Sequence, residues 1–297
     1  MVESTIICVV LLCAPAAAPA TQASPPRSPS MLVSVAELKA MLKDPAVVVL
    51  HVADRGAVFA EGHIPGSRPI SYADFAVDGD GLGSELPSRE TAKRVFEAAG
   101  VSDESRVVIY AQGPVTAARA FFTLDAFGHQ KVAILDGGFR AWRDAGLPVE
   151  SGPPAASKAG SFTPRLNPQR LADAALIQQR SPAGGIALVD VRPDPEFFGS
   201  DGGMNGMHAA GHIAGARQLT WNALVGADGL FLPAAQLQQK LEAAGVIAGK
   251  PVVSYCMVGM RASVVYFVAR HLGYDAKLYD GSIVDWSRRK LPVVQKD

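Results

Sequence analysis

Short apolar runs rich in β-branched residues alternate with amphipathic stretches along most of the chain. The apolar runs predict buried strands at residues 46–52, 107–110, 132–135, 186–191 and 252–255. The amphipathic stretches predict helices at residues 35–42, 88–99, 117–127, 233–244 and 262–272. Strands that are apolar throughout are typical of parallel sheets with helices on both faces, so the pattern predicts an α/β fold.

The same pattern occurs twice. Four segments recur in the same order 144 to 149 positions later: residues 61–68 as 210–217, 96–101 as 241–246, 107–110 as 252–255, and 136–142 as 280–286. Four collinear matches indicate a duplication. We therefore expect two similar domains, at residues 32–148 and 163–297, each with a mainly parallel sheet flanked by helices on both faces. Residues 149–162, rich in glycine, proline, serine and alanine, are the expected linker.

The beginning of the chain follows a different pattern. An apolar run at residues 6–13 is followed by small residues and then by a polar spacer. The run is too short to cross a membrane, but this order is typical of a secretory signal peptide. Residues 1–30 are thus expected to be a leader that directs the protein to the periplasm or the exterior. Glu3 stands where a basic residue is usual, which leaves the alternative of a cytoplasmic protein starting at Met31.

Charge and motif content argue against several classes of function. Lys plus Arg and Asp plus Glu both number 28, and no basic tract interrupts the chain, which disfavours a general electrostatic grip on nucleic acid. The sequence has no glycine-rich dinucleotide motif or phosphate-binding loop, and no Cys/His cluster with zinc-ligand spacing. We therefore expect no cofactor, no metal and no nucleic acid partner, while a protein partner stays unknown.

One cysteine stands out. Cys8 and Cys13 belong to the expected leader, so Cys256 is the single cysteine of the two domains. It directly follows the predicted strand 252–255, and in open α/β sheets ligands bind beyond the carboxyl ends of the strands. A lone cysteine is more often buried filler than a reactive thiol, but its position and the loop that follows favour the reactive reading.

The loop after Cys256 has the composition of an anion site. It runs through Met257, Val258, Gly259, Met260 and Arg261 into a predicted helix. Unpaired N–H groups at a helix start and in a concave loop favour an anion, Gly259 permits a tight turn, and Arg261 adds positive charge. These influences favour the thiolate, the attacking form of cysteine. We expect Cys256 to be the nucleophile and the five loop residues to contact the substrate.

These residues resemble a known family. The loop, and the stretch 255–286 around it, resemble the active-site region of the rhodanese superfamily. Residues 188–197 and 211–216, together with the duplication, resemble the tandem-domain sulfurtransferases over nearly the whole chain from Leu32. The resemblance implies two similar α/β domains of which only the second is catalytic. It also implies that Cys256 takes a sulfane sulfur from a donor, becomes a persulfide, and passes the sulfur to a thiophilic acceptor such as cyanide or a thiol.

The two copies differ where this chemistry would occur. Ala111 stands opposite Cys256, and the loop 111–116 has neither a thiol nor an arginine, so the first domain is expected to pack against the second and wall the cleft. Arg192 also follows a strand, and the resemblance makes it a candidate contact for the anionic donor. Residues shared by both copies, such as His63 and His212, are expected to be structural.

Several functions stay open at this point. Arg261 favours the doubly charged thiosulfate as donor, with 3-mercaptopyruvate as the alternative. A non-catalytic sulfur-carrier or regulatory module is the alternative of another class. Phosphatases with a cysteine-to-arginine anion loop have five residues between the two, whereas residues 257–260 provide four, and the loop contains no carboxylic acid to protonate a leaving group. Phosphatase chemistry is therefore disfavoured.

Overall fold

The computed structural model describes residues 1, 30–53, 57–78, 81–154 and 158–295. The leader prediction, together with Cys8 and Cys13, lies outside the described residues. Within those ranges, every helix is too short or too polar to span a bilayer.

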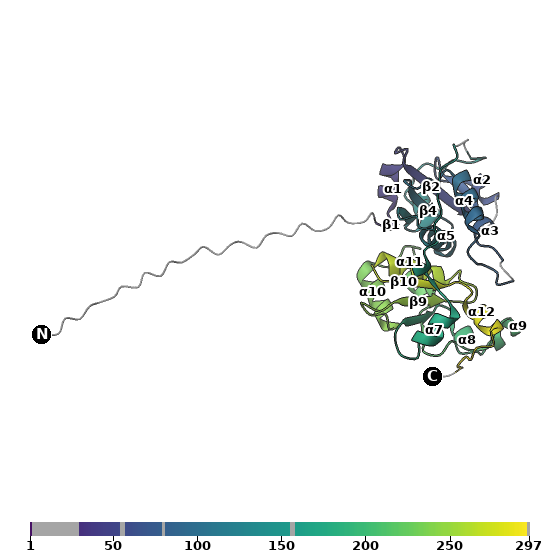
Figure 1. Ribbon diagram of the computed structural model, residues 1–297. Coiled ribbons are helices and arrows are strands. Elements are labelled where there is room, and N and C mark those ends of the chain that lie inside the picture. The colour runs from purple at the N-terminus through teal and green to yellow at the C-terminus, as the bar shows by residue number, and fades with distance from the viewer. Residues whose placement is uncertain (2–29, 54–56, 79–80, 155–157, 296–297) are drawn as a thin grey trace.

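The chain forms two halves of matching layout (Figure 1). The first half contains β1 (Leu32–Val33), α1 (Val35–Met41), β2 (Val47–Ala53), α2 (Ala57–Glu61), β3 (Arg68–Ser71), α3 (Tyr72–Phe75), α4 (Arg89–Ala98), β4 (Arg106–Tyr110), α5 (Pro114–Ala126), β5 (Val132–Leu135) and α6 (Gly138–Asp144). The second half contains a short 3-10 turn (Pro168–Arg170), β6 (Leu171–Ala172), α7 (Ala174–Arg180), β7 (Ala187–Asp190), α8 (Asp194–Phe197), α9 (Gly202–Gly206), β8 (Arg217–Gln218), a second 3-10 turn (Trp221–Leu224), α10 (Ala234–Ala243), β9 (Val252–Tyr255), α11 (Ala262–His271), β10 (Ala276–Tyr279) and α12 (Ser282–Arg288).

Both sheets have the same topology. Among the described residues each sheet has five parallel strands, in the orders β1-β5-β4-β2-β3 and β6-β10-β9-β7-β8. This confirms the predicted pair of duplicated α/β domains. The predicted strands and helices lie within one residue of the observed bounds, except that α5 begins three residues earlier, at Pro114. Proline is favoured in the first turn of a helix because its missing N–H has no helical partner there.

Each sheet has an outer face of its own and an inner face that both domains share. Helices α1 and α6 cover the outer face of the first sheet through Leu38 and Trp142, and α7 and α12 cover that of the second through Ile177 and Trp286. The inner faces merge into one hydrophobic cluster that includes α5 and α11. These two helices lie side by side between the sheets (Figure 1). Their apolar faces therefore fix how the domains pack.

Paired aromatic rings mark the contact between α5 and α11. Phe121 packs edge-on against Phe267 at a ring-centroid distance of 4.9 Å, and Phe122 packs against Tyr266 at 5.0 Å. All four side chains are completely buried. Aromatic pairs of this geometry stabilise by about 0.5–1.5 kcal/mol beyond the area they bury. The interface is thus an extension of the core.

The residues shared by both copies are structural, as expected. His63 stacks on Phe59 and His212 on Phe197, each with ring centroids 3.8 Å apart. In each copy the Nδ1 atom of the histidine lies 3.0 Å from the backbone oxygen of that phenylalanine. The two histidines therefore perform the same packing role in both domains.

A buried carboxylate joins the two central helices. Asp125 of α5 accepts hydrogen bonds from the Tyr266 hydroxyl and from the Arg270 guanidinium, both on α11. Arg170 adds an ion pair at 3.3 Å. The side chain of Asp125 is only 7% exposed, so little solvent screens these charges.

We expect Asp125→Ala to lower the free energy of unfolding by about 1–3 kcal/mol, because it leaves the buried Tyr266 hydroxyl without its acceptor and two partly buried arginines without their carboxylate. Asp144→Ala is the control, since Asp144 pairs with Arg140 on the surface and is 68% exposed. That control should change stability by less than about 1 kcal/mol. Urea denaturation of both variants measures the difference, and equal midpoints would contradict the proposed role of Asp125.

Candidate active site

Cys256 lies at the end of β9 and is completely buried. Its backbone N–H donates to Ser282 Oγ at 3.1 Å, and its carbonyl oxygen accepts from the Ile283 N–H at 3.1 Å. Ser282 has a φ of 53°, in the left-handed region that non-glycine residues rarely adopt. The first copy has Gly138 at the equivalent position, with a φ of 57°. The serine hydroxyl thus holds the backbone of Cys256, a role that sequence reasoning missed although the change from glycine was visible.

The loop after Cys256 forms a set of unpaired backbone donors. From Met257 to Arg261, no backbone N–H donates a hydrogen bond within the described part of the chain. Gly259 shapes this loop, with a φ of 84°. A Cβ atom there would lie 2.7 Å from Asp280 Oδ1, so another residue would both strain the backbone and clash. Consecutive unpaired amides in such a turn form a concave anion site.

The side chains of the loop spread in different directions. Met257 packs against the outer core of the second domain. Val258 lies beside Gly83 of the first domain, where a Cβ atom would be 3.4 Å from Val258 Cγ1. Met260, like Met257 and Val258, is half-buried. These apolar side chains and the burial of Cys256 make the surroundings of the thiol poor in water.

The positive charge of Arg261 is paired with the carboxylate of Glu196. Its Nη1 and Nη2 atoms donate to Glu196 Oε1 and Oε2 at 2.7 and 2.8 Å, a bidentate pair in which the side chains are 25% and 9% exposed. Burial alone would lower the pKa of Arg261, but the Glu196 hydrogen bonds and the electrostatic interaction with Cys256 raise it. Sequence reasoning missed that Glu196 would pair with Arg261.

Arg192 does not fit the expected contact with a bound donor. Its side chain is completely buried and donates to both carboxylate oxygens of Asp190, at distances of 2.7 to 3.1 Å. A further bond of 2.8 Å goes to the carbonyl oxygen of Gly211. Burial opposes the charge of Arg192, yet Asp190 raises its pKa above the ordinary value. The arginine therefore ties the end of β7 to the loop before β8.

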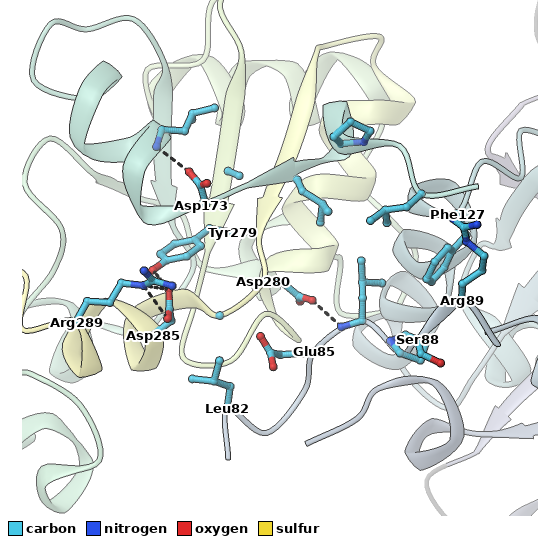
Figure 2. A pocket seen from close by; sticks show the side chains of 18 of the residues that line it. Leu82, Glu85, Ser88, Arg89, Phe127, Asp173, Tyr279, Asp280, Asp285 and Arg289 are labelled. Atoms are coloured by element: carbon cyan, nitrogen blue, oxygen red, sulfur yellow. Dashed lines mark hydrogen bonds and ion pairs between the residues drawn. The ribbon is translucent and has the colours of Figure 1, made fainter. Parts of the chain in front are cut away.

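Two hollows lie near the loop. A cavity of about 380 Å³ beside Arg261 is lined by Val191, Pro193, Asp194, Pro195, Thr220, Trp221, Asn222 and Arg261. A larger groove of about 1040 Å³ runs between the domains, and Asp280, Glu85 and Arg89 are among its lining residues (Figure 2). Cys256 lines neither, in accord with its complete burial. The smaller cavity gives a small anion a way to approach Arg261.

The comparison with known families agrees with this layout. A family model described as a rhodanese-like domain matches residues 34–145 and again residues 173–289. The chain belongs to the rhodanese family. Both halves are thus rhodanese domains, and the second supplies the cysteine loop.

Relatives of this rhodanese align along most of its length. The sulfur carrier protein TtuD of Thermus thermophilus is 32% identical, covering 87% of this chain and 94% of its own. A probable 3-mercaptopyruvate sulfurtransferase of Pseudomonas aeruginosa is 33% identical, with coverages of 87% and 95%. A thiosulfate sulfurtransferase of Corynebacterium glutamicum is 31% identical, with coverages of 89% and 90%. The protein is therefore a rhodanese-type sulfurtransferase, and two of these relatives are named after different donors.

Solved structures show the same tandem arrangement. The crystal structure of SseA from Escherichia coli, a 3-mercaptopyruvate sulfurtransferase, superimposes with a TM-score of 0.75 at 26% identity, covering 86% of this rhodanese and 99% of that chain. The crystal structure of YnjE gives a TM-score of 0.81 at 28% identity, with coverages of 90% and 68%. The tandem rhodanese fold is thus shared with proteins of quite different sequence.

We expect Arg192→Met to lower the free energy of unfolding by about 3–5 kcal/mol, because it leaves the Asp190 carboxylate buried without a counter-charge. The double variant Asp190→Asn/Arg192→Met removes both charges and should regain part of that loss. Thermal and urea denaturation measure both effects. A stable Arg192→Met variant with a raised Michaelis constant for the sulfur donor would instead restore the direct-contact hypothesis.

Proposed function

We propose that this rhodanese moves a sulfane sulfur from thiosulfate to a thiophilic acceptor, cyanide or a thiol, through a persulfide on Cys256. The observation that carries the proposal is the row of unpaired N–H groups from Met257 to Arg261, which begins next to the cysteine. Such a cradle favours the thiolate and can hold the negative charge of a bound donor or of the persulfide. The site thus suits a reaction whose reactants and intermediate are all anionic.

The proposed reaction has two half-reactions. The Cys256 thiolate attacks the sulfane sulfur of thiosulfate, a new S–S bond forms, and sulfite leaves with the electron pair of the broken bond. The acceptor then attacks the outer sulfur of the persulfide, and the Cys256 thiolate is the leaving group. With cyanide the product is thiocyanate, and with a thiol it is a new persulfide. The Cys256 thiolate and the Cys256 persulfide both carry a charge of minus one. A fixed set of backbone amides can therefore stabilise both forms.

3-Mercaptopyruvate is the second candidate donor, and one observation favours it. The charge of Arg261 is matched by Glu196 at 2.7 and 2.8 Å, so the loop has less excess positive charge than the sequence suggested. Thiosulfate carries two negative charges, whereas 3-mercaptopyruvate carries its charge on a separate carboxylate. Relatives named after each donor align with this chain at similar identity. The choice of donor therefore depends on how strongly Glu196 offsets Arg261.

A sulfur carrier without turnover of small donors is the alternative of another class. The relative from Thermus thermophilus is named a sulfur carrier protein. Both functions need a persulfide on Cys256, and they differ in whether small donors and acceptors react quickly. Steady-state turnover with thiosulfate and cyanide separates them.

We expect Cys256→Ser to abolish sulfur transfer and leave the fold intact, because serine is close in size but far less ionised than cysteine. Wild-type protein incubated with thiosulfate alone should gain the mass of one sulfur atom per chain and lose it again on addition of cyanide. Intact-mass spectrometry follows both steps. Persistent turnover by Cys256→Ser, or sulfur loading elsewhere in that variant, would refute the persulfide mechanism.

Glu196→Gln should lower the Michaelis constant for thiosulfate by about three- to tenfold, because an electrostatic change on the order of 1 kcal/mol is expected when the carboxylate charge is removed. Glutamine keeps an acceptor for the Arg261 guanidinium. The effect should be smaller for 3-mercaptopyruvate, which carries less charge. Arg261→Ala is the opposite control and should raise the Michaelis constant for thiosulfate. An unaltered ratio of the two donors in Glu196→Gln would show that this ion pair does not govern donor choice.

A further inference from the structure

Part of the first domain lies directly against the catalytic loop. Gly83 faces Val258, and the Leu86 N–H donates to Asp280 Oδ2 at 2.7 Å (Figure 2 shows this bond). Arg119 of α5, with no exposed surface, donates to both oxygens of the same carboxylate. The segment from Gly83 to Leu86 is therefore fixed as a wall beside the loop.

Two hydroxyl groups sit at this wall. Tyr72, the first residue of α3, and Ser84 share a short hydrogen bond in which either oxygen can be the donor. Ser84 is only 1% exposed, and Tyr72 is half-buried. Ser84 directly follows Gly83, which lies against Val258, so the two hydroxyl groups lie beside the loop that follows Cys256. The non-catalytic domain thus brings a pair of hydroxyls to the active site.

The Tyr72 and Ser84 hydroxyl groups together have one hydrogen that their mutual hydrogen bond does not use. The two hydroxyls carry two hydrogens, and the bond between them takes one. Within the described part of the chain, neither oxygen has another hydrogen-bond partner. A hydroxyl hydrogen without an acceptor at such a partly buried site is available to a ligand or to water. Burial raises the pKa of Tyr72 above its ordinary value, so the hydroxyl keeps its proton at neutral pH.

We propose that Tyr72 completes the sulfur-donor site: its hydroxyl, oriented by Ser84, donates a hydrogen bond to the part of the donor that leaves when the sulfur passes to Cys256. The inference rests on the persulfide function proposed above and adds a residue from the other domain to it. In this arrangement Ser84 donates to the Tyr72 oxygen, and the Tyr72 hydrogen points to the ligand. Tyr72 then acts on the substrate, and Ser84 is a positioning residue.

The hydrogen bond has different consequences for the two donors. With thiosulfate, the S–S bond breaks and sulfite leaves with the electron pair, and its oxygens carry negative charge before and after the step. With 3-mercaptopyruvate, the C–S bond breaks and the electron pair moves into the leaving group, which departs as the enolate of pyruvate and later takes a proton from solvent on carbon. The enolate oxygen becomes negative only during the reaction. A donor aimed at such an oxygen accelerates the step, whereas one that binds a constant charge mainly improves affinity.

Tyr72→Phe therefore has a donor-specific effect. Persulfide formation from 3-mercaptopyruvate should slow by about a hundredfold, mainly in kcat, as expected when one donor to a developing oxyanion is lost. With thiosulfate the loss should be about tenfold and should appear mainly in KM, as expected for one charge-assisted bond at the low end of the usual strength. Discharge of the preformed persulfide by cyanide should be unchanged. Ser84→Ala should show the same pattern with a smaller loss, since it leaves the tyrosine in place but less well oriented.

The matched control is Tyr110→Phe in the full chain. Tyr110 is another buried tyrosine of the first domain, and its hydroxyl serves Ile64 and Ser67 rather than the catalytic loop. This variant should lose stability but keep the rates with both donors. Stopped-flow and intact-mass measurements of persulfide formation, with melting temperatures for every variant, provide the comparison. Equal rates in Tyr72→Phe and Tyr110→Phe with both donors, while wild type is active, would overturn this inference alone. A wild-type chain that takes sulfur from neither donor would overturn the proposed function as well.

Discussion

The carboxylate of Asp280 joins the two domains and the loop that follows Cys256 at one point. It follows β10, accepts hydrogen bonds from Arg119 and the Leu86 N–H of the first domain, and lies where a side chain on Gly259 would have to be. Because Arg119 is completely buried, separating the domains would leave a guanidinium without its counter-charge. The shape of the anion cradle therefore depends on the first domain, although that domain has no nucleophile.

The cations around the cysteine each have a carboxylate of their own. Arg261 pairs with Glu196, Arg192 with Asp190, and Arg119 with Asp280. Side-chain charge near the loop is thus largely balanced, and the unpaired backbone amides of residues 257–261 are the donors that stay available to an anion. Amide dipoles stabilise a thiolate, a persulfide or a small oxyanion without the strong preference for a dianion that an unpaired arginine would give. This balance is compatible with relatives that bear the names of two different donors.

The strands and helices could be predicted well from the sequence, but the pairing of charged side chains could not. Apolar runs such as residues 46–52 and helices such as α11 are local patterns, so their bounds were predicted to within one residue. The two-residue strands β1, β6 and β8 carry too few positions for any periodicity, and they form only because a neighbouring strand is present. The position of Cys256 could be predicted because a strand and a helix fix it. The partners of Arg192 and Arg261 could not, since Asp190 and Glu196 are brought to them by packing.

The duplication explains how one copy became the support of the other. Asp136 accepts a hydrogen bond from the Phe231 N–H at 2.8 Å, and Asp280 accepts one from the Leu86 N–H. Each domain therefore binds a loop of the other domain through an equivalent aspartate. Only the second domain has a cysteine in the loop after its central strand. The buried pair Asp190 and Arg192 corresponds in the first copy to His51 and Ala53, and burial lowers the pKa of His51 to about 4, which keeps that site uncharged.

In the central helices it is the first domain that carries the charged residue and the second that carries an uncharged one. Arg119 of α5 stands opposite Val264 of α11, so the first domain carries the cation that reaches across the interface and the second carries an apolar residue there. In a single chain the two copies can diverge in this complementary way. Each copy always packs against the other copy and never against an identical one, so a change on one side can be matched by a different change on the other. The first copy has Ala111 where the second has Cys256, and it supplies Arg119 to the interface, so the two copies carry different parts of the site. On this view the catalytic unit is the whole tandem, and the second domain alone would lack both its anchoring cation and its wall.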